Sequence, residues 1–218
     1  MNRPSVPTAA LAGVPAGLQA QGVWIGHRQL FVRFAAEAET ATMYTADALA
    51  SEIRRAMSRS SFHSISITGR DPLANVDYLR DAFARVETAL PVMLDCDGQR
   101  PEQIPELKKI VRLAQITLDG SGSESAHDRA FASLAAAAAS DMQHGLVLNV
   151  DGHTTDAHML RVVERAHETS GAAAVVIHPS AATPVDKDRR WTTLFERAGA
   201  LHGNVRLLLR LPPPTGMR

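Results

Sequence analysis

Short apolar runs alternate along the chain with longer segments in which apolar residues recur every three or four positions. The first kind of pattern is typical of buried strands and the second of amphipathic helices. Strands are predicted at residues 23–34, 64–68, 92–95, 114–118, 145–150, 173–178 and 204–209. Helices are predicted at residues 45–59, 75–90, 102–111, 124–142, 155–169 and 188–201. The chain therefore repeats a strand–helix unit six or seven times.

This repeat predicts an α/β fold. Strands that are apolar throughout and separated each time by a helix pair in parallel through right-handed crossovers. An open doubly wound sheet and an incomplete barrel both fit the pattern, and both place the functional site at the carboxyl ends of the strands. No break in composition divides the series, so we expect one domain over residues 18–218.

The first 17 residues differ from the rest. Pro4, Pro7 and Pro15 interrupt their apolar patches, so a flexible arm is predicted over residues 1–17 and no signal peptide is recognised. No apolar run approaches the roughly 20 residues that span a bilayer. We therefore expect a cytoplasmic protein that does not interact with membranes.

Charge and cysteine content narrow the function classes. The 218 residues include 23 Lys and Arg against 23 Asp and Glu, a net charge of zero, which argues against a nucleic-acid binder because phosphates require a basic surplus. Cys96 is the only cysteine of the sequence. An intramolecular disulfide, a cysteine-rich zinc site and a cysteine-held iron–sulfur cluster are all excluded on this count.

Several short segments resemble one enzyme family. The stretch ITGRDPL at residues 67–73 is similar to the ITGGEPL segment of radical S-adenosylmethionine enzymes. QAQG at 19–22, VWIG at 23–26 and LFVRFA at 30–35 resemble the QGEG…G…FVRFAG opening of 7-carboxy-7-deazaguanine synthases, DCDG at 95–98 stands in place of their ETNG, and NVRL at 204–207 is similar to their last strand. These segments occur in the same order over essentially the whole chain.

The resemblance implies an incomplete (β/α)6-type barrel of mostly parallel strands, a homodimer, and a small-molecule ligand. Active members of the family bind a [4Fe-4S] cluster and S-adenosylmethionine, and contract 6-carboxy-tetrahydropterin to a 7-deazaguanine. Their cluster is held by a CxxxCxxC motif directly after the FVRFAG strand. Residues 35–44 of this chain, AAEAETATMY, contain no cysteine, so a [4Fe-4S] cluster of the family type is excluded. Glu37, Glu39 and Thr40 of this loop could bind a hard cation or could be solvated.

The cofactor motif is altered as well. By the resemblance, Thr68, Gly69, Arg70 and Asp71 are the counterparts of residues that bind S-adenosylmethionine. Arg70 replaces the second glycine of GGEP and brings a cation to the place of a cationic ligand, and Asp71 is one methylene shorter than the glutamate. We therefore expect no S-adenosylmethionine binding and no cofactor, and an ion pair of Arg70 with Asp71 or Glu37 is the structural alternative.

The substrate side of the motif is partly kept. By the resemblance, the substrate-side residues are Gln19, Gln21, Gly22, Arg33 and Asp97. Arg33 corresponds to the arginine that meets the substrate carboxylate, a task that its planar guanidinium suits. An inward-facing arginine paired with Asp95 or Asp119 is an equal alternative.

Other strand ends carry residues of possible chemical use. Asp151 and His153 are candidate metal ligands, although Thr154 or Thr155 followed by Asp156 also indicates a helix N-cap. His178 is a candidate general base, and Asp97 and Asp119 are further catalytic candidates. The serines at 121, 123 and 125 near His127 form a solvated loop in the default interpretation, because a catalytic triad is defined in space.

These observations favour a degenerate relative of 7-carboxy-7-deazaguanine synthase without a cluster, acting as a small-molecule-binding, partner or regulatory protein. Radical chemistry is not expected. The alternative is a non-radical enzyme, with or without a metal, that acts on a pterin-like or purine-like molecule at the mouth of the barrel.

Overall fold

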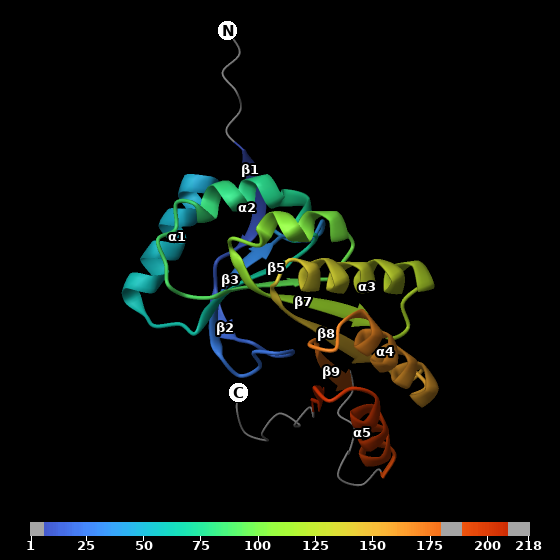
Figure 1. Ribbon diagram of the computed structural model, residues 1–218. Helices are drawn as coiled ribbons and strands as arrows, with labels where there is room; N and C mark the ends of the chain where they lie inside the picture. Colours follow the sequence, from blue (N-terminus) through green and yellow to red (C-terminus); the bar gives the residue numbers. More distant parts are fainter. Residues whose placement is uncertain (1–6, 180–188, 209–218) are drawn as a thin grey trace.

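The computed structural model describes residues 7–179 and 189–208, and all statements on structure refer to them. One sheet of ten strands runs through the molecule (Figure 1). The strands are β1 (Thr8–Gly13), β2 (Ala16–Leu18), β3 (Arg28–Phe34), β4 (Thr42–Thr45), β5 (Ser64–Gly69), β6 (Val92–Cys96), β7 (Val111–Asp119), β8 (Gln143–Val150), β9 (Ala174–Pro179) and β10 (Val205–Leu207). The helices are α1 (Ala46–Arg59), α2 (Val76–Phe83), α3 (Glu124–Ala139), α4 (Asp156–Thr169) and α5 (Arg189–Leu201), with 3₁₀ segments η1 (Pro72–Asn75) and η2 (Pro101–Leu107).

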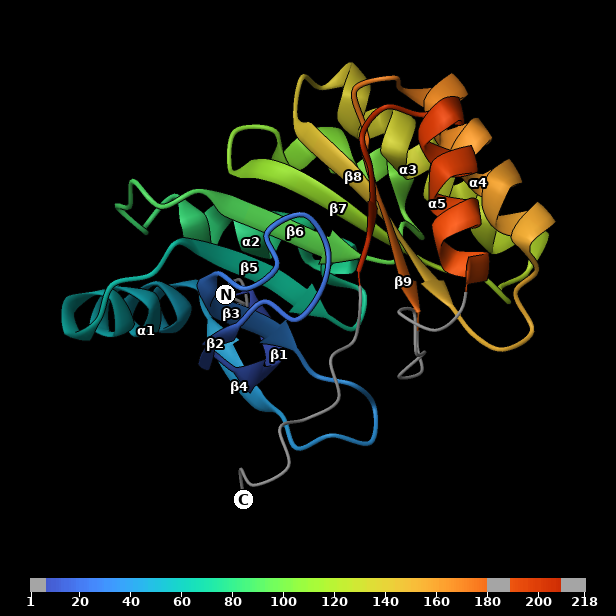
Figure 2. The ribbon, with the colours of Figure 1, turned by 90° about the horizontal axis from the view of Figure 1, so that it is seen from below.

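The strand order confirms the predicted α/β fold with a mostly parallel sheet. Strands β3, β5, β6, β7, β8, β9 and β10 are neighbours in the order of the chain, and every pair among them is parallel. A doubly wound sheet requires a reversal of this order, and none occurs here. The described strands form an open sheet with β10 and β4 at its edges, and the helices gather on one side of it (Figure 2).

Several elements begin where the sequence predicts. Thr45 caps α1 through its hydroxyl, which accepts a hydrogen bond from the Ala48 amide at 3.1 Å. Thr155 caps α4 in the same way, with the His158 amide as donor at 3.2 Å. In α1 the periodic residues Leu49 and Ile53 are fully buried against the sheet, as the four-residue spacing predicts.

Two predicted helices are wrong in extent or type. The helix expected at 102–111 is the 3₁₀ segment η2, which contains Pro105. Proline has no N–H to donate to the preceding turn and its ring clashes with it, so an α-helix does not continue there. The helix expected at 75–90 ends at Phe83, and the chain continues through hydrogen-bonded turns to Val86.

The flexible arm predicted over residues 1–17 is wrong where the structure describes this segment. Strand β1 lies between β3 and β4 and is antiparallel to both. Ala9 and Leu11 alternate with exposed neighbours and are buried in the core, which is the period-2 pattern of a half-buried strand. Strand β2 then pairs with β3. Residues 23–27, expected to begin a strand, belong instead to the connection between β2 and β3, which covers residues 19–27.

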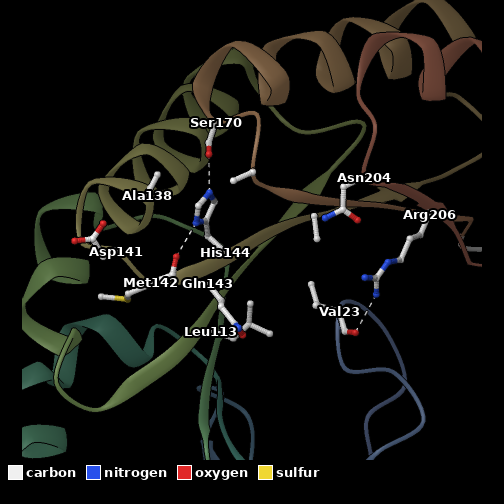
Figure 3. Close-up of a pocket in the computed structure, with 12 residues that line it drawn as sticks. Val23, Leu113, Ala138, Asp141, Met142, Gln143, His144, Ser170, Asn204 and Arg206 are labelled. Atoms are coloured by element: carbon white, nitrogen blue, oxygen red, sulfur yellow. Dashed lines mark hydrogen bonds between the residues drawn. The ribbon is translucent and has the colours of Figure 1, made fainter.

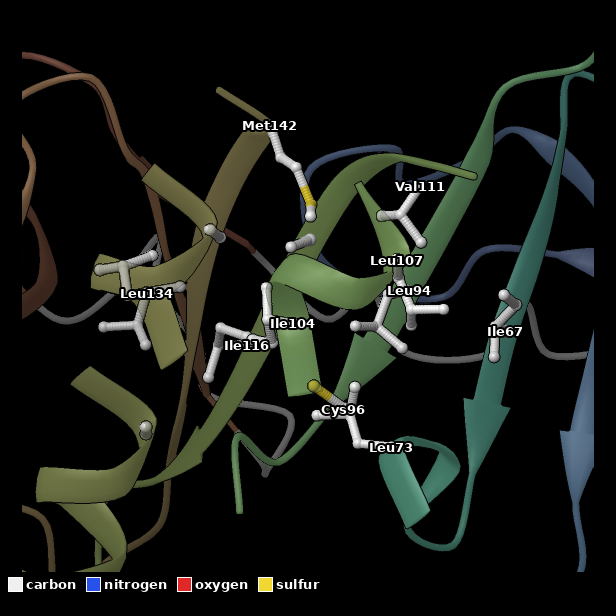
Figure 4. Close-up of a cluster of buried hydrophobic side chains, with 14 of the residues drawn as sticks. Ile67, Leu73, Leu94, Cys96, Ile104, Leu107, Val111, Ile116, Leu134 and Met142 are labelled. Atoms are coloured by element: carbon white, nitrogen blue, oxygen red, sulfur yellow. The ribbon is translucent and has the colours of Figure 1, made fainter. Parts of the chain in front are cut away.

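The hydrophobic core fills the space between the sheet and its helices. Ile67 on β5, Leu94 on β6 and Ile116 on β7 point into it together with Leu107 of η2 and Leu134 of α3 (Figure 4). No helix among the described residues is both long and apolar enough to cross a membrane.

Candidate functional site

The face of the sheet opposite the helices carries most of the polar side chains of the central strands, among apolar ones such as Met93, Leu113 and Val147, and is called the polar face. Side chains alternate along each strand, so the neighbours of core residues point away from the helices. The polar residues on this face are Gln29, Arg33, Ser64, Ser66, Thr68, Asp95, Gln115, Thr117, Asp119, Asn149, His178 and Arg206. Five of the candidate residues from the sequence lie on this face: Arg33, Thr68, Asp119, His178 and the predicted ion-pair partner Asp95.

The connection between β2 and β3 crosses this polar face (Figure 2). The Val23 amide donates a hydrogen bond to Oε1 of Gln115 at 2.9 Å, and Nη1 of Arg206 donates to the Val23 carbonyl at 3.2 Å. Gly22 has φ +85°, and a Cβ there would lie 1.9 Å from Oε1 of Gln115. Glycine is therefore required for the close approach of this connection to β7.

Gln19 closes the first part of this connection. Its side chain is 4% exposed and donates from Nε2 to the Gln21 carbonyl at 2.9 Å. Gln19 and Gly22 thus determine the path of the connection, and Gln21 lies near the carboxyl ends of β7, β8 and β9. The resemblance implied a substrate-side position for all three, and Gln21 lines a cavity.

Asp95 lies beneath the connection. Burial raises the pKa of this carboxyl, while hydrogen bonds from Gln115, Thr117 and Gln19 partly oppose the rise. The Thr117 hydroxyl donates to its Oδ1 at 3.1 Å. Because burial disfavours the charged form of a carboxyl, Asp95 depends on these hydrogen bonds, which tie it to β7 and to the connection.

A cavity of about 320 Å³ opens at the carboxyl ends of β7, β8 and β9. The lining residues are Gln21, Asp119, Ser121, Asn149, Val150, Asp151 and His178. Four candidates from distant parts of the sequence, Gln21, Asp119, Asp151 and His178, thus meet in one place. The rule that sites lie at strand ends could also have found Asn149, the last residue but one of β8.

The hydrogen bonds of the cavity orient two of its side chains. Nδ1 of His178 lies 3.1 Å from Oδ1 of Asn149. An amide oxygen only accepts, so the proton of this bond is on His178, and the Asn149 amide nitrogen is the donor end of that side chain. Asp119 accepts hydrogen bonds at Oδ1 from the Ser121 amide and hydroxyl, at 3.1 and 2.9 Å.

Asp151 has a structural role at the rim of this cavity. Its Oδ1 accepts from the Thr154 hydroxyl at 2.7 Å, the Thr154 amide at 2.9 Å and the His153 amide at 3.0 Å. These bonds lower the pKa of Asp151, that from the Thr154 hydroxyl most. His153 is exposed, and among the described residues no three His, Cys, Asp or Glu side chains are placed to hold one metal ion.

The carboxyl ends of β3, β5 and β6 lie beside those of β7, β8 and β9, and three ion pairs are found there. Arg70 lies 2.9 Å from Glu37, one of the two pairings that the sequence leaves open. Arg33 lies 2.9 Å from Glu39. The predicted partners Asp95 and Asp119 are wrong for Arg33, because its side chain is 52% exposed at the strand end and meets the adjoining loop.

The third ion pair joins Asp71 to Arg100. Nε of Arg100 lies 3.0 Å from both carboxylate oxygens of Asp71, and Nη2 lies 2.9 Å from Oδ2. This bidentate geometry is the strongest form of an arginine–carboxylate contact. The two residues that depart from GGEP therefore each have a partner within this chain.

The turn after β5 fixes the backbone at these residues. Gly69 has φ +99°, and a Cβ there would lie 2.2 Å from the Phe34 carbonyl oxygen. The Arg70 amide donates to that same oxygen at 3.1 Å, and Asp71 follows in the left-handed region with φ 41°. Thr68 precedes this turn as a neighbour of Arg33 in the parallel ladder.

The residues present do not fit a three-cysteine cluster. The loop over residues 35–41 has no cysteine. Cys96 points into the core beside Leu73 (Figure 4), and burial raises the pKa of its thiol to about 12. Thiolate is the ligand form of cysteine, so neither the loop nor Cys96 offers a donor set for such a group.

Asp97 stands apart from the cavity. It is exposed in the turn after β6, where its Oδ1 accepts from the Gln99 amide at 3.2 Å. The next residue, Gly98, has φ +73° and packs against α3, with its carbonyl accepting from the Ser133 hydroxyl at 2.8 Å. The turn places Asp97 on the surface, and it does not join Asp119 and His178.

A larger cavity, of about 640 Å³, lies at the opposite, amino ends of β7 to β10 (Figure 3). His144 stands at its wall with Nδ1 2.8 Å from the Met142 carbonyl and Nε2 2.7 Å from the Ser170 hydroxyl. Val23 and Arg206 close another side. The sequence gives no indication of this cavity, because the strand-end rule directs attention to the other edge.

Comparison with known proteins yields distant similarity. No protein-family model matches the chain. It is 27% identical over 124 residues to a 7-carboxy-7-deazaguanine synthase from Methanothermobacter thermautotrophicus (strain ATCC 29096 / DSM 1053 / JCM 10044 / NBRC 100330 / Delta H), a match covering 50% of this chain and 49% of that protein. The chain thus spans about half the length of the curated relative that it matches. This is a distant relationship that reaches, at most, to the radical S-adenosylmethionine enzymes.

A solved structure is similar at a low level. The crystal structure of 3-keto-D-glucoside 4-epimerase, YcjR, from E. coli in its apo form has a TM-score of 0.30 and 13% sequence identity, covering 76% of this chain and 88% of that chain. The fold is therefore described by its own strand order.

Proposed function

We propose that this chain is a cluster-free relative of 7-carboxy-7-deazaguanine synthase that binds a small polar molecule in the cavity at the carboxyl ends of β7, β8 and β9. One observation carries the proposal: the two halves of this edge differ. At β3, β5 and β6 the charged side chains of Arg33, Arg70 and Asp71 have partners within the chain. At β7 to β9, polar side chains surround a cavity of about 320 Å³.

The first half argues against radical chemistry. No thiolate is available after β3, and Arg70 with its partner Glu37 stands where the resemblance would put S-adenosylmethionine. The unreversed strand order and the one-sided helices support a partial barrel as the frame for the site. A binding, partner or regulatory role without a cofactor follows from these features more directly than a lyase activity.

The chemistry of the cavity favours a flat heterocycle with both donors and acceptors on its edge. Asp119 offers a carboxylate acceptor, Asn149 an amide donor, and Gln21 either group. Pterins and purines carry adjacent N–H donors and ring-nitrogen acceptors, and the carboxylate of Asp119 and the amides of Asn149 and Gln21 can pair with such groups. The volume lies at the lower end of the range for small-molecule sites.

Binding and cluster chemistry can be tested on the same preparation. We expect a pterin or purine to raise the melting temperature of the protein, and we expect Asp119→Asn to reduce that shift by removing the carboxylate acceptor. Asp97→Asn is the matched control, because Asp97 is on the same edge of the sheet but outside the cavity. Absence of a shift with every pterin and purine tested would count against the ligand class.

Anaerobic reconstitution with iron and sulfide tests whether the protein can hold an iron–sulfur cluster. We expect no stoichiometric cluster and no reductive cleavage of S-adenosylmethionine. Formation of both would overturn the cluster-free proposal, whatever the outcome of the binding experiment.

A second candidate function, a non-radical enzyme, rests on His178. His178 lines the cavity, and its Nδ1 contact with Oδ1 of Asn149 at 3.1 Å orients the ring, so it is placed as a candidate general base for a bound molecule. Turnover of a bound pterin or purine that His178→Gln abolishes, while the ligand still raises the melting temperature, would favour this candidate over binding alone.

A further inference from the structure

Two glutamine side chains hold the connection between β2 and β3 on either side of Gly22, next to the point where Gln21 lines the cavity. On one side, Nε2 of Gln19 donates to the Gln21 carbonyl at 2.9 Å. On the other side, Oε1 of Gln115 accepts from the Val23 amide at 2.9 Å. Both glutamines are buried, with 4% and 0% of their surface exposed. The backbone at Gln21 is therefore fixed by two amide groups, each of which must present the correct end.

The two amide groups share one further partner, the carboxyl group of Asp95 on β6. Gln19 and Gln115 both form hydrogen bonds with this carboxyl, as does the Thr117 hydroxyl. An amide oxygen only accepts and an amide nitrogen only donates. Because Oε1 of Gln115 accepts from a backbone amide, its Nε2 is the atom that faces Asp95, and this buried nitrogen has no other partner among the described residues.

A carboxylate suits this position because three donor groups surround it, one hydroxyl and two amide NH2 groups. An ionised carboxylate has two acceptor oxygens and no donor, so it selects the orientation in which both amides turn their nitrogens toward it. That orientation leaves Oε1 of Gln115 directed at Val23. In Asp95→Asn an NH2 group replaces one acceptor and opposes these donors. If Gln115 then turned over, its own NH2 would meet the Val23 N–H, and two donors form no hydrogen bond.

We propose that Asp95 is a positioning residue, which acts through the amides of Gln19 and Gln115 to fix the backbone of Gln21 at the cavity. The benefit to ligand binding rests on the proposed function, whereas the position of the connection does not. Arg206 also holds the connection, by a hydrogen bond of its own. Loss of the carboxylate therefore loosens the connection locally and does not release it.

Amide hydrogen exchange of the full chain, followed by NMR, measures the position of the connection without any ligand. The Val23 amide is the reporter, because Gln115 accepts its hydrogen bond. We expect Asp95→Asn and Gln115→Glu each to speed its exchange by about tenfold or more, the first by placing a donor among donors and the second by placing two carboxyl groups together. The amides of the central strand β8 should stay protected, which shows that the sheet is intact.

Combining Asp95→Asn with Gln115→Glu should restore the pattern with the roles exchanged. The amide introduced at the first position can donate to the carboxylate introduced at the second, whose other oxygen accepts from Val23. We expect the exchange rate of the Val23 amide to return to within about threefold of the wild-type rate, a recovery that a general loss of packing would not give. Asp97→Asn, the same substitution in the exposed turn after β6, is the matched control and should leave the rate unchanged. Wild-type exchange in Asp95→Asn, or a combined variant that exchanges as fast as the single variants, would overturn the proposal.

Pterin and guanine then separate this inference from the proposed function. Where either compound raises the melting temperature of the wild type, the shift should be smaller in Asp95→Asn and should recover in the combined variant. An equal shift in all variants, despite fast exchange at Val23, would overturn the role of Asp95 in binding. Absence of a shift in every protein would contradict the ligand class of the proposed function, while the exchange rates decide the positioning of Gln21 on their own.

Discussion

The Thr117 hydroxyl donates a hydrogen bond to Oδ1 of Asp95 from the neighbouring strand, at 3.1 Å. This contact holds a carboxyl group on the polar face of the sheet, under the connection between β2 and β3. The amides of Gln19 and Gln115 also face the carboxyl. The connection and the sheet are therefore joined through a group whose charge is disfavoured by burial.

Asp95→Asn should change the pH dependence of stability. Because the folded pKa of Asp95 is raised above 3.8, the folded state holds this proton more tightly than the unfolded state, and stability falls as pH rises from about 4 to the raised pKa. The asparagine variant lacks this loss, so its free energy of unfolding should rise relative to that of the wild type over that pH range. Urea unfolding at a series of pH values measures the difference, with Asp97→Asn as a surface control for net charge. An Asp95→Asn difference that is flat with pH would contradict the assignment.

Gly69→Ala should destabilise the protein by at least ~2 kcal/mol, because alanine disfavours φ +99° and its Cβ would lie 2.2 Å from the Phe34 carbonyl oxygen. Gly199→Ala provides the contrast. It replaces an exposed glycine inside α5 with no atom within 4 Å of the new Cβ, so stability should rise by about 0.5–1 kcal/mol. Chemical denaturation of both variants gives the two free energies. Equal effects would mean that the turn after β5 is not fixed as described.

Cys96 should be inert toward thiol reagents in the folded protein. Its side chain is 5% exposed, and a pKa of about 12 leaves almost no thiolate at neutral pH. Ellman's reagent should react at least 100-fold more slowly with the native protein than with the protein unfolded in guanidinium. Equally fast reaction in both states would show that Cys96 is accessible and that the end of β6 is packed loosely.

The parts of the fold that local chemistry determines could be predicted from the sequence. The caps Thr45 and Thr155 were predictable because a hydroxyl before a periodic segment satisfies the first free amides of a helix. The strands β5 to β9 were predictable because each is a compact apolar run between two helices. The limits of η2 could also have been inferred, since Pro105 lies inside the helix expected there.

The parts that depend on long-range pairing could not be predicted in this way. Strand β1 has a small-residue sequence bounded by prolines, and only its partners β3 and β4 make it a strand. Arg33 pairs with Glu39 rather than with an inward carboxylate because the loop after β3 folds back over the strand end, which no spacing specifies. The cavity at β7 to β9 was anticipated through its strand ends, but the position of Gln21 within it depends on the connection that crosses the sheet.

That connection also constrains the order in which the protein can assemble. Val23 accepts a hydrogen bond from Arg206, 183 residues further along the chain. During synthesis this hydrogen bond waits until β10 has emerged, because contacts of such sequence separation can close only after the intervening strands are made. Gln115 of β7 can hold the connection before Arg206 is available, so the connection gains its two partners at different stages of synthesis.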